Sequence, residues 1–335
     1  MRRSTLKATP LVASLLAAGL VLTACGGSAE KEKEEPEAKQ TAEVATPETW
    51  PLTGLEAEDG EEVALDRPVL VVKIDNSGKA TQSGLSDADL VFEELVEGGT
   101  TRLAAFYYSE LPELVGPVRS MRATDVGIIA GTGAQIVTSG AAVPTIQRIN
   151  DARIPFHEEG AQGIFRDRSR RAPYNLMANL KEVAAKASIE AERPDDYFTF
   201  GTAEELPAGE PASAVSVSFG NRTTQWVFGK KAWKNTNTNA AQGDTYTPDT
   251  ILALTVPVED AGYKDPSGSF VPESVFEGSG TAQLFHGGKV VTGTWEKRGL
   301  DGQLRLKADG QELKVPAGRV FVELVPETGK VTVTP

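Results

Sequence analysis

Residues 214–335 form a long series of short apolar or alternating runs, such as TTQWVF, KVVTGTWEK and RVFVELVP. Turn signals separate several of them, among them Asp301-Gly302 and Asp309-Gly310. Period-two alternation interrupted by glycine-containing pairs predicts strands joined by tight turns. A long helix does not fit this pattern, so the segment is predicted to be a small β-rich C-terminal domain, barrel- or sandwich-like.

The preceding segment, residues 49–190, mixes both kinds of pattern. The run PVLVVKID at 68–75 is apolar and β-branched before it ends in polar residues, which predicts a buried strand. Ser86 is a candidate cap for a single helical turn. Further strands are expected over 91–96, 101–108 and 134–139, and helices over 120–129, 144–151 and 176–188. This is a mixed α/β domain, which makes the whole chain α+β. Residues 191–213, rich in Pro, Glu and Ala, are the predicted linker.

Cys25 is the only cysteine of the chain. It follows a positive segment with Arg2, Arg3 and Lys7 and an apolar run over 10–22, which is shorter than the ~20 residues of a membrane span. Small residues before such a cysteine, here LTAC, are typical of a bacterial lipoprotein signal. We expect 1–24 to be a signal peptide, Cys25 to carry lipid, palmitate included, and 25–48 to be a disordered tether. An uncleaved anchor is the alternative.

The net charge is −13, and the predicted signal peptide holds three of the positive charges. Such an acidic surface repels phosphates, which argues against non-specific nucleic-acid binding. It also repels an anionic bilayer, so lipid on Cys25 would hold the chain at the extracytoplasmic face of the cell membrane. The chain has no cysteine after residue 25, which excludes cysteine catalysis, thiolate metal sites and disulfides in the exported part.

Several segments resemble one bacterial family. DNS at 75–77, the stretch from QSGLSDADL to FYYSE at 82–110, GPVRSMR at 116–122 and RAPYNL at 171–176 resemble the N-terminal half of the YerB-like lipoproteins. Residues 278–297 and 306–326 resemble the C-terminal domain of that family. The resemblance implies a two-domain lipoprotein outside the cytoplasmic membrane and supplies no reaction. The family pattern has Ala-Arg-Pro where 79–81 read KAT, and often His where Tyr174 stands, so roles of those residues do not transfer.

Two arginines, Arg119 and Arg122, lie three residues apart in GPVRSMR. The proline and Ser120 suit the entrance to a helix, where free N–H groups beside arginines favour a phosphate or a carboxylate. We expect Arg102 to join them from a neighbouring strand. The alternative is that these arginines form ion pairs within the domain, with Glu93, Glu94 or Glu97.

A second arginine cluster lies in FRDRSRRAPYN, residues 165–175. Neighbouring Glu158, Glu159 and Asp167 dilute its charge, so a solvated loop is equally consistent. If this loop converges with GPVRSMR, the two form an anion pocket for teichoic-type phosphate polymers, peptidoglycan stem carboxylates or lipid head groups. The ligand-binding residues predicted from the sequence are Arg102, Arg119, Arg122, Arg166, Arg168 and Arg171.

Catalytic hypotheses rest on fewer residues. Glu93 and Glu97 lie an even number apart in a predicted strand, hence on one face, and paired carboxylates perform glycosidase chemistry. Ser139 ends a predicted strand, but serine catalysis needs a base, and only His157 and His286 exist. Neither histidine belongs to a motif, and two scattered histidines without cysteine argue against zinc. We expect no cofactor and no metal.

Two other features have simpler structural interpretations. Asp75-Asn76 predicts a strand end with an Asx turn more simply than a cation site. Trp226, Trp233 and Trp295 suit a sugar-stacking platform, but aromatic residues of small β domains more often belong to the core.

The sequence therefore predicts a lipid-anchored cell-envelope protein with a non-catalytic binding or scaffold role and an arginine-lined anion site. A cell-wall glycan hydrolase using Glu93 or Glu97 is the alternative, and a structural module that presents the β domain to a membrane partner is a third. The expected partners are the membrane, through lipid on Cys25, and an anionic envelope ligand or envelope protein, without nucleic acid.

Overall fold

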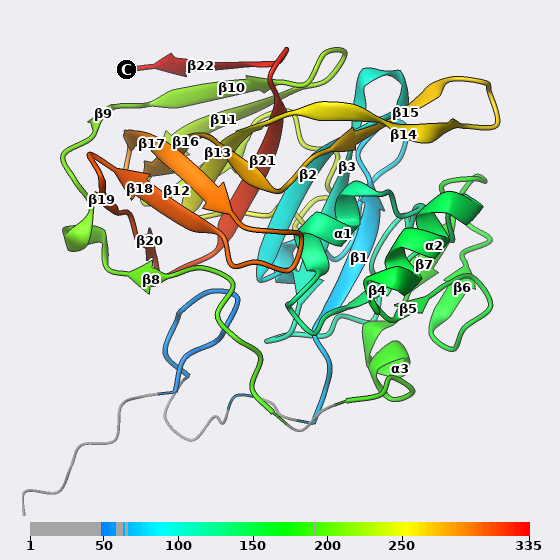
Figure 1. The fold of residues 1–335 in the computed structure, drawn as a ribbon. Coiled ribbons are helices and arrows are strands. Elements are labelled where there is room, and N and C mark those ends of the chain that lie inside the picture. Colours follow the sequence, from blue (N-terminus) through cyan, green and yellow to red (C-terminus); the bar gives the residue numbers. More distant parts are fainter. Residues whose placement is uncertain (1–47, 58–62, 64–65, 190–191) are drawn as a thin grey trace, which may run out of the picture. The chain divides into compact units, whose positions relative to one another are not determined.

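Strand β1 (Leu70–Asp75) lies inside the main sheet of the computed structural model (Figure 1). All six of its residues are buried, as expected for an apolar β-branched run covered on both faces. The structure describes residues 48–57, 63, 66–189 and 192–335. The predicted signal peptide, Cys25 and nearly all of the predicted tether lie outside these residues.

The main sheet combines strands from both sequence segments. Its other N-terminal strands are β2 (Leu90–Val96), β3 (Thr100–Tyr107), β4 (Gln135–Val137) and β5 (Phe156–His157). Its later strands are β9 (Glu210–Pro211), β13 (Thr250–Val256), β16 (Gly278–His286), β17 (Lys289–Lys297), β18 (Arg305–Ala308), β19 (Gln311–Glu312) and β21 (Val320–Pro326). The order is β19-β18-β17-β16-β13-β21-β2-β3-β1-β4-β5, and β9 pairs with β17. The sheet is therefore continuous from one segment into the other, through parallel pairing of β21 with β2.

Smaller elements complete the fold. A four-stranded sheet has the order β12-β11-β10-β22, with β10 (Ala214–Ser218), β11 (Thr223–Gly229), β12 (Ala232–Asn235) and β22 (Lys330–Thr334). Two-stranded pairs are β6 (Ile164–Arg166) with β7 (Leu176–Ala178), β14 (Val258–Lys264) with β15 (Phe270–Ser274), and β8 (Phe200–Gly201) with β20 (Val315–Pro316). The α-helices are α1 (Thr124–Ile129), α2 (Val143–Asp151) and α3 (Leu180–Ala184). The 3₁₀ turns are η1 (Leu85–Asp87), η2 (Glu97–Gly99) and η3 (Ala203–Glu205).

The two faces of the central strands have separate hydrophobic cores. One core packs Phe92 and Phe106 against α1 and Tyr197, with the ring centroids of Phe92 and Tyr197 5.4 Å apart. The other packs the same strands against the four-stranded sheet, where the rings of Trp226 and Phe321 lie 4.7 Å apart. The α+β prediction with a β-rich C-terminal segment is confirmed. Trp226, Trp233 and Trp295 are at most 1 % exposed, which confirms that they belong to the core.

The helix predicted over 176–188 is wrong at its start. Leu176 and Met177 pair with β6 in strand β7, and helix α3 begins only after Asn179, whose side chain accepts a hydrogen bond from the Glu182 amide at 3.3 Å. The predicted apolar face is buried as expected at Leu176 and Leu180. Burial was therefore predictable, whereas the apolar spacing did not reveal the change from strand to helix.

The helix predicted over 120–129 is also shorter than expected. Residues 116–119 run as an extended segment between β1 and β7, because Val118 N donates to Leu176 O and Arg119 N donates to Lys73 O. A Cβ on Gly116 would lie 3.0 Å from Leu176 O, so this close approach requires glycine. Ser120 does not cap α1, which starts at Thr124. Ser86 likewise lies inside the predicted single turn and does not cap it.

Candidate functional site

Charged side chains gather on one face of the central strands, near the end of β1. The register places Asp75 of β1 opposite Arg102 of β3, and Arg102 opposite Glu94 of β2. These three residues are at most 6 % exposed. Ionised groups are rarely buried unless they are paired, so each charge in this row needs a partner.

Lys73 provides one such partner inside the sheet. Its ammonium group donates to Glu94 Oε1 at 2.6 Å and to Asp125 Oδ1 at 2.5 Å, and all three side chains are completely buried. Glu94 Oε2 has no hydrogen-bond partner. Burial, followed by the charge of Asp125, raises the pKa of Glu94 to about 7, although Lys73 opposes this shift. This cluster fixes the start of α1 against the sheet.

Arg122 forms an ion pair within the protein. Its Nε and Nη2 donate to the two carboxylate oxygens of Glu97 at 2.7 and 2.9 Å. Its backbone amide donates to Asp125 Oδ2 at 2.7 Å. Burial opposes ionisation of Glu97, but the hydrogen bonds and charge of Arg122 lower the pKa of this carboxyl below its ordinary value. The ion-pair interpretation is therefore the one that describes Arg122.

Arg102 is more deeply buried and has fewer partners. Only 6 % of the residue is exposed, and its Nη1 donates to Ser120 O at 2.5 Å. Among the described residues, its remaining donors make no hydrogen bond. Burial, then the charges of Arg122 and Arg119, lowers the pKa of Arg102 to about 10. The three arginines thus lie closely enough to act on one another.

Arg119 lies at the outer side of this group, with 26 % of its side chain exposed. Its Nε forms an ion pair with Asp75 Oδ2 at 3.4 Å but makes no hydrogen bond with any described residue. Its Nη1 donates to Pro173 O at 3.4 Å, and its guanidinium carbon lies 5.4 Å from the ring centroid of Tyr174. Arg119 therefore connects the buried row with the loop 165–175, although most of its donors are weakly engaged.

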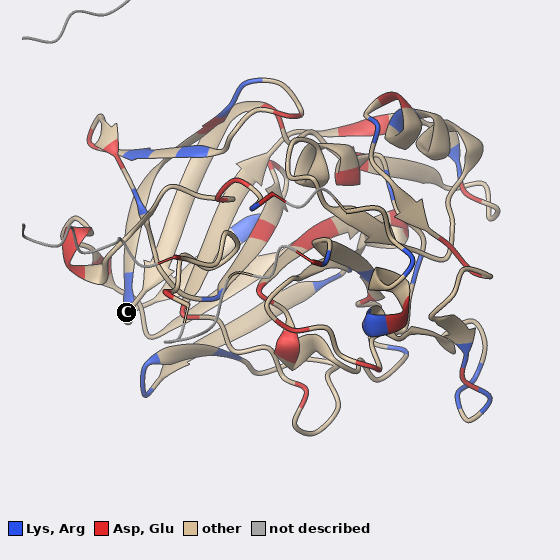
Figure 2. Cartoon of the chain, turned by 90° about the horizontal axis from the view of Figure 1, so that it is seen from below, with Lys and Arg blue, Asp and Glu red and all other residues tan. Residues whose placement is uncertain are grey.

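The arginines of the loop 165–175 fall into two groups, those with partners inside the protein and those that are exposed. Arg166 pairs with both carboxylate oxygens of Glu159 at 2.5 Å, and Arg170 donates to Thr81 O and Ser83 Oγ at 2.7 Å. Arg168 and Arg171 are exposed and form no ion pair with any described residue. Figure 2 shows basic and acidic residues interspersed over the ribbon, so a small number of unpaired arginines, not a large basic surface, distinguishes this region.

The carboxylates of the hydrolase hypothesis do not share a face. Glu93 points to the core of the four-stranded sheet, where its side chain accepts hydrogen bonds from Asn76, Thr101 and Thr224. Glu97 lies beyond the end of β2, in η2, and faces Arg122. The prediction that they share one strand face is wrong, because the turn at Gly98-Gly99 begins at Glu97.

Neither histidine forms a hydrogen bond with the Ser139 hydroxyl among the described residues. The Ser139 hydroxyl lies 3.1 Å from the Ser120 hydroxyl. His157 Nε2 is paired with Gln135 Oε1, and His286 Nδ1 with Thr250 Oγ1, each at 2.9 Å. The Asx turn at Asp75 is confirmed, since Ser77 N donates to Asp75 Oδ1 at 3.0 Å.

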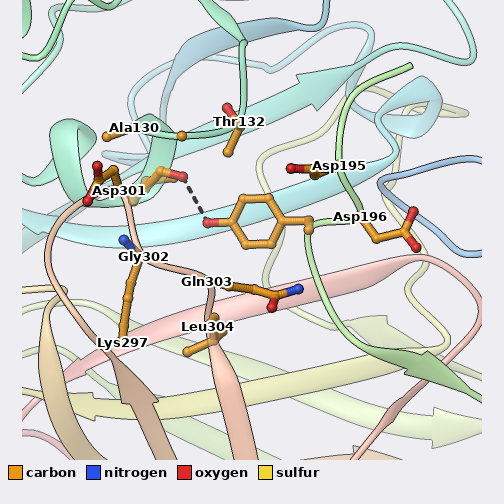
Figure 3. Close-up of a pocket in the computed structure, with 12 residues that line it drawn as sticks. Ala130, Thr132, Asp195, Asp196, Lys297, Asp301, Gly302, Gln303 and Leu304 are labelled. Carbon is orange, nitrogen blue, oxygen red and sulfur yellow. Dashed lines mark hydrogen bonds between the residues drawn. The ribbon is translucent and has the colours of Figure 1, made fainter. Parts of the chain in front are cut away.

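A hollow of about 470 Å³ lies elsewhere, where residues 128–132, 195–197 and 297–304 meet (Figure 3). The Tyr197 hydroxyl donates to Ile128 O at 2.8 Å within it. Burial lowers the pKa of Lys297 to about 8, and its ammonium group donates to backbone carbonyls of its own turn, Gly299 at 3.2 Å and Leu300. None of the predicted ligand-binding arginines lines this hollow.

Three buried charged residues were not predicted from the sequence: Lys73 and Asp125, which are partners within the site, and Glu323. A signal was present for two of them, because Lys73 interrupts the run at 68–75 that is predicted to be a buried strand, and Glu323 interrupts the apolar run RVFVELVP. A charge in such a run must be paired or neutralised. Within the described parts of the chain, no group of three His, Cys, Asp or Glu side chains is arranged to hold a metal ion, and no helix is long and apolar enough to cross a membrane.

Comparisons with known proteins agree on one family. Residues 52–193 match the "Protein of unknown function (DUF3048) N-terminal domain", and residues 214–322 match the corresponding C-terminal domain. The chain is 28% identical over 291 residues to the Bacillus subtilis protein named "Putative lipoprotein YerB", covering 83% of this chain and 86% of the relative. The crystal structure of YerB protein from Bacillus subtilis superposes with a TM-score of 0.69 at 22% identity, covering 85% of this chain and 99% of that one. The resemblance predicted from the sequence motifs is confirmed, and the chain belongs to the YerB-like family of two-domain DUF3048 proteins.

Proposed function

We propose that the chain is a lipid-anchored, extracytoplasmic binding protein that holds an oxyanion at Arg102 and Arg119. The observation behind this proposal is that only 6 % of Arg102 is exposed, yet a single hydrogen bond, to Ser120 O, engages its guanidinium among the described residues. A buried guanidinium gains most from an ionised acceptor, because charge-assisted hydrogen bonds are the strong ones. Phosphate and carboxylate both match the planar arrangement of its donors.

The neighbouring groups make this position favourable for an anion. Burial, and then the positive charges of Arg122 and Arg119, lower the pKa of Arg102 to about 10, and the charges of Glu97 and Glu94 only partly oppose this shift. Arg122 is neutralised by Glu97, which leaves Arg119 as the second donor, with only a longer contact of 3.4 Å to Asp75. The hydroxyls of Ser120 and Ser139 lie on the same loop and the adjacent strand end. The carboxylates nearest to these donors, Asp75 and Glu97, form ion pairs with Arg119 and Arg122, which supports binding more than catalysis.

The loop 165–175 supports an extended anion. Tyr174 and Pro173 contact Arg119 from this loop, and Arg168 and Arg171 are exposed beyond them. A repeating phosphate polymer would meet these arginines after its first phosphate is held at Arg102. Arg166 contributes less, because Glu159 already occupies its fork.

The anchor is proposed from the sequence and from one relative. LTAC at 22–25 matches a lipoprotein signal, and the Bacillus subtilis relative is named as a lipoprotein. We expect Cys25 to incorporate labelled palmitate and the protein to sediment with membranes. A Cys25→Ala variant should lose the label and leave the membrane fraction, and retention of the label would contradict the assignment.

The anion site is tested with the full-length protein in neutral detergent, titrated with inorganic phosphate and with poly(glycerol phosphate). Binding to the folded state raises the melting temperature, and calorimetry gives the affinity. We expect Arg119→Ala to weaken binding of both probes at least about tenfold, as the loss of one charge-assisted contact implies. Arg298→Ala is the matched control, because 88% of the Arg298 side chain is exposed and its ion-pair partner is Glu296. Both residues are far from Arg119 in the sequence. Equal binding by the wild type and Arg119→Ala, or equal loss in both variants, would exclude the site.

A further inference from the structure

Two glutamates meet inside the protein where its two sequence segments join. Glu93 of β2 and Glu323 of β21 are register partners in the parallel ladder that links these strands. Both residues are completely buried. Two ionised carboxylates side by side without solvent repel each other and lose hydration, so such a pair is stable only if one group is neutral.

The hydrogen-bond donors around Glu93 identify the ionised member. Asn76 Nδ2 and Thr101 Oγ1 donate to Glu93 Oε1 at 2.9 and 2.6 Å, and Thr224 Oγ1 donates to Oε2 at 2.7 Å. These donors come from three different segments and all point to the carboxylate oxygens. A carboxylate that accepts three hydrogen bonds is stabilised in its charged form.

Glu323 has the opposite environment. Trp226 Nε1 donates to Glu323 Oε1 at 2.7 Å, whereas Oε2 is buried and no described residue donates to it. An ionised oxygen left in this state would be costly, but a protonated one can itself donate. We propose that Glu323 holds a proton on Oε2 and donates it to the Glu93 carboxylate, so that one shared proton fastens β21 to β2.

The surrounding charges agree with this assignment. Burial, and then the charge of Glu93, raise the pKa of Glu323 well above its ordinary value. The hydrogen bond from Trp226 and the charge of Arg222, which precedes β11, lower the pKa of Glu323 and only partly oppose this shift. The neighbouring side chains on β3 and β11 are Thr101, Thr224 and Trp226, which are uncharged. Behind β1, Gln82 and Asn239 donate to Asn76 Oδ1 at 3.2 and 3.3 Å and hold its amide toward Glu93.

The consequence is a clamp between the two family domains that weakens in alkali. Deprotonation of Glu323 places two negative charges across the β2–β21 ladder. The backbone hydrogen bonds of this ladder join the segments that precede and follow residues 191–213. This clamp does not depend on the anion site, because Glu93 and Arg102 belong to opposite faces of the sheet and have no common partner.

The first test compares melting temperatures of the full-length wild type and Glu323→Gln from pH 5 to pH 9. The glutamine amide of this variant can accept from Trp226 and donate to Glu93, so it imitates the protonated acid. Native wild type retains a proton that the unfolded chain releases above its ordinary pKa, so its stability falls as pH rises. We expect the two proteins to melt alike near pH 5 and the variant to gain steadily above that. A difference that stays constant with pH would overturn the proposal.

Two further measurements keep the test independent of one variant. Glu93→Gln should lower the melting temperature at every pH, because it removes the charge that Asn76, Thr101 and Thr224 stabilise. Equal behaviour of the two glutamine variants would contradict the assignment of the proton.

Infrared spectra of the wild type at pH 8 should contain a protonated-carboxyl band that disappears at higher pH. Glu94→Gln serves as the control that leaves this band in place, and absence of the band in the wild type would refute the shared proton.

Discussion

Arg122 and Arg119 differ in what their guanidinium groups bind. Arg122 forms a bidentate ion pair with Glu97, whereas Arg119 Nε lies 3.4 Å from Asp75 Oδ2 and makes no hydrogen bond with any described residue. The two residues lie three positions apart in one segment, and their side chains have 13% and 26% exposure. The same motif therefore combines a bidentately paired arginine with one whose contacts, to Asp75, Pro173 O and the Tyr174 ring, are longer.

The Arg122–Glu97 pair is expected to stabilise the fold. Arg122→Ala leaves the half-buried Glu97 carboxylate without its partner, and we expect the free energy of unfolding to fall by roughly 1–3 kcal/mol. Arg119→Ala should cost under about 1 kcal/mol, because its contacts are long and partly exposed. Urea unfolding of both variants measures the difference. A larger loss for Arg119→Ala than for Arg122→Ala would contradict this division.

Lys73 is expected to be the most costly of the site residues to replace. Lys73→Met leaves two fully buried carboxylates, Glu94 and Asp125, without a cation, and breaking a buried pair in this way costs about 3–5 kcal/mol. Lys181→Met is a matched control, because its pair with Glu113 is 63% and 69% exposed and such pairs contribute at most about 1 kcal/mol. Chemical denaturation should separate the two variants clearly; similar losses would show that the buried cluster is not held by Lys73.

Some of this arrangement was predictable from the sequence and some was not. Strand β1 followed from PVLVVKID because a β-branched apolar run needs no knowledge of its neighbours. Arg119 and Arg122 were grouped by helix-start signals and Arg102 by its place in a neighbouring predicted strand, although residues 116–119 are extended against β7. The partners of these arginines depend on strand register, which decides whether Glu93 or Glu94 faces them, and register is set by pairing between distant strands.

The boundary at Asn179 gives a local test of the corrected element. Asn179→Ala removes the side-chain acceptor of the Glu182 amide, so we expect a loss of about 0.5–2 kcal/mol. Asn179→Asp retains an acceptor and should recover most of that loss. If a continuous helix ran from residue 176, alanine at this position would instead stabilise it, since alanine is the best helix former. Thermal unfolding of the two variants therefore distinguishes a cap from a helix interior.

Glu94 is expected to make stability fall as the pH rises from about 4.5 to 7. Its folded-state pKa of about 7 exceeds the ordinary value of 4.5, because burial and Asp125 disfavour the charged form. Between these values the folded chain holds a proton that the unfolded chain has lost, so its contribution is complete below the lower value and is lost above the upper one. Glu94→Gln removes this contribution, which is roughly 3 kcal/mol over the window.

This expectation is measured by urea unfolding of the wild type and Glu94→Gln at pH 4.5, 6 and 8. Glu323 also makes wild-type stability fall over this range, so the informative quantity is the difference between the two proteins at each pH. The stability of Glu94→Gln relative to the wild type should rise with pH up to about 7 and then level off. The difference caused by Glu323→Gln should also rise with pH, because burial raises the pKa of Glu323 well above its ordinary value. Glu113→Gln, at a side chain that is 69% exposed, should show no such trend. A relative stability of Glu94→Gln that does not change between pH 4.5 and 7 would mean that Glu94 is ionised throughout, held by Lys73 more strongly than burial opposes it.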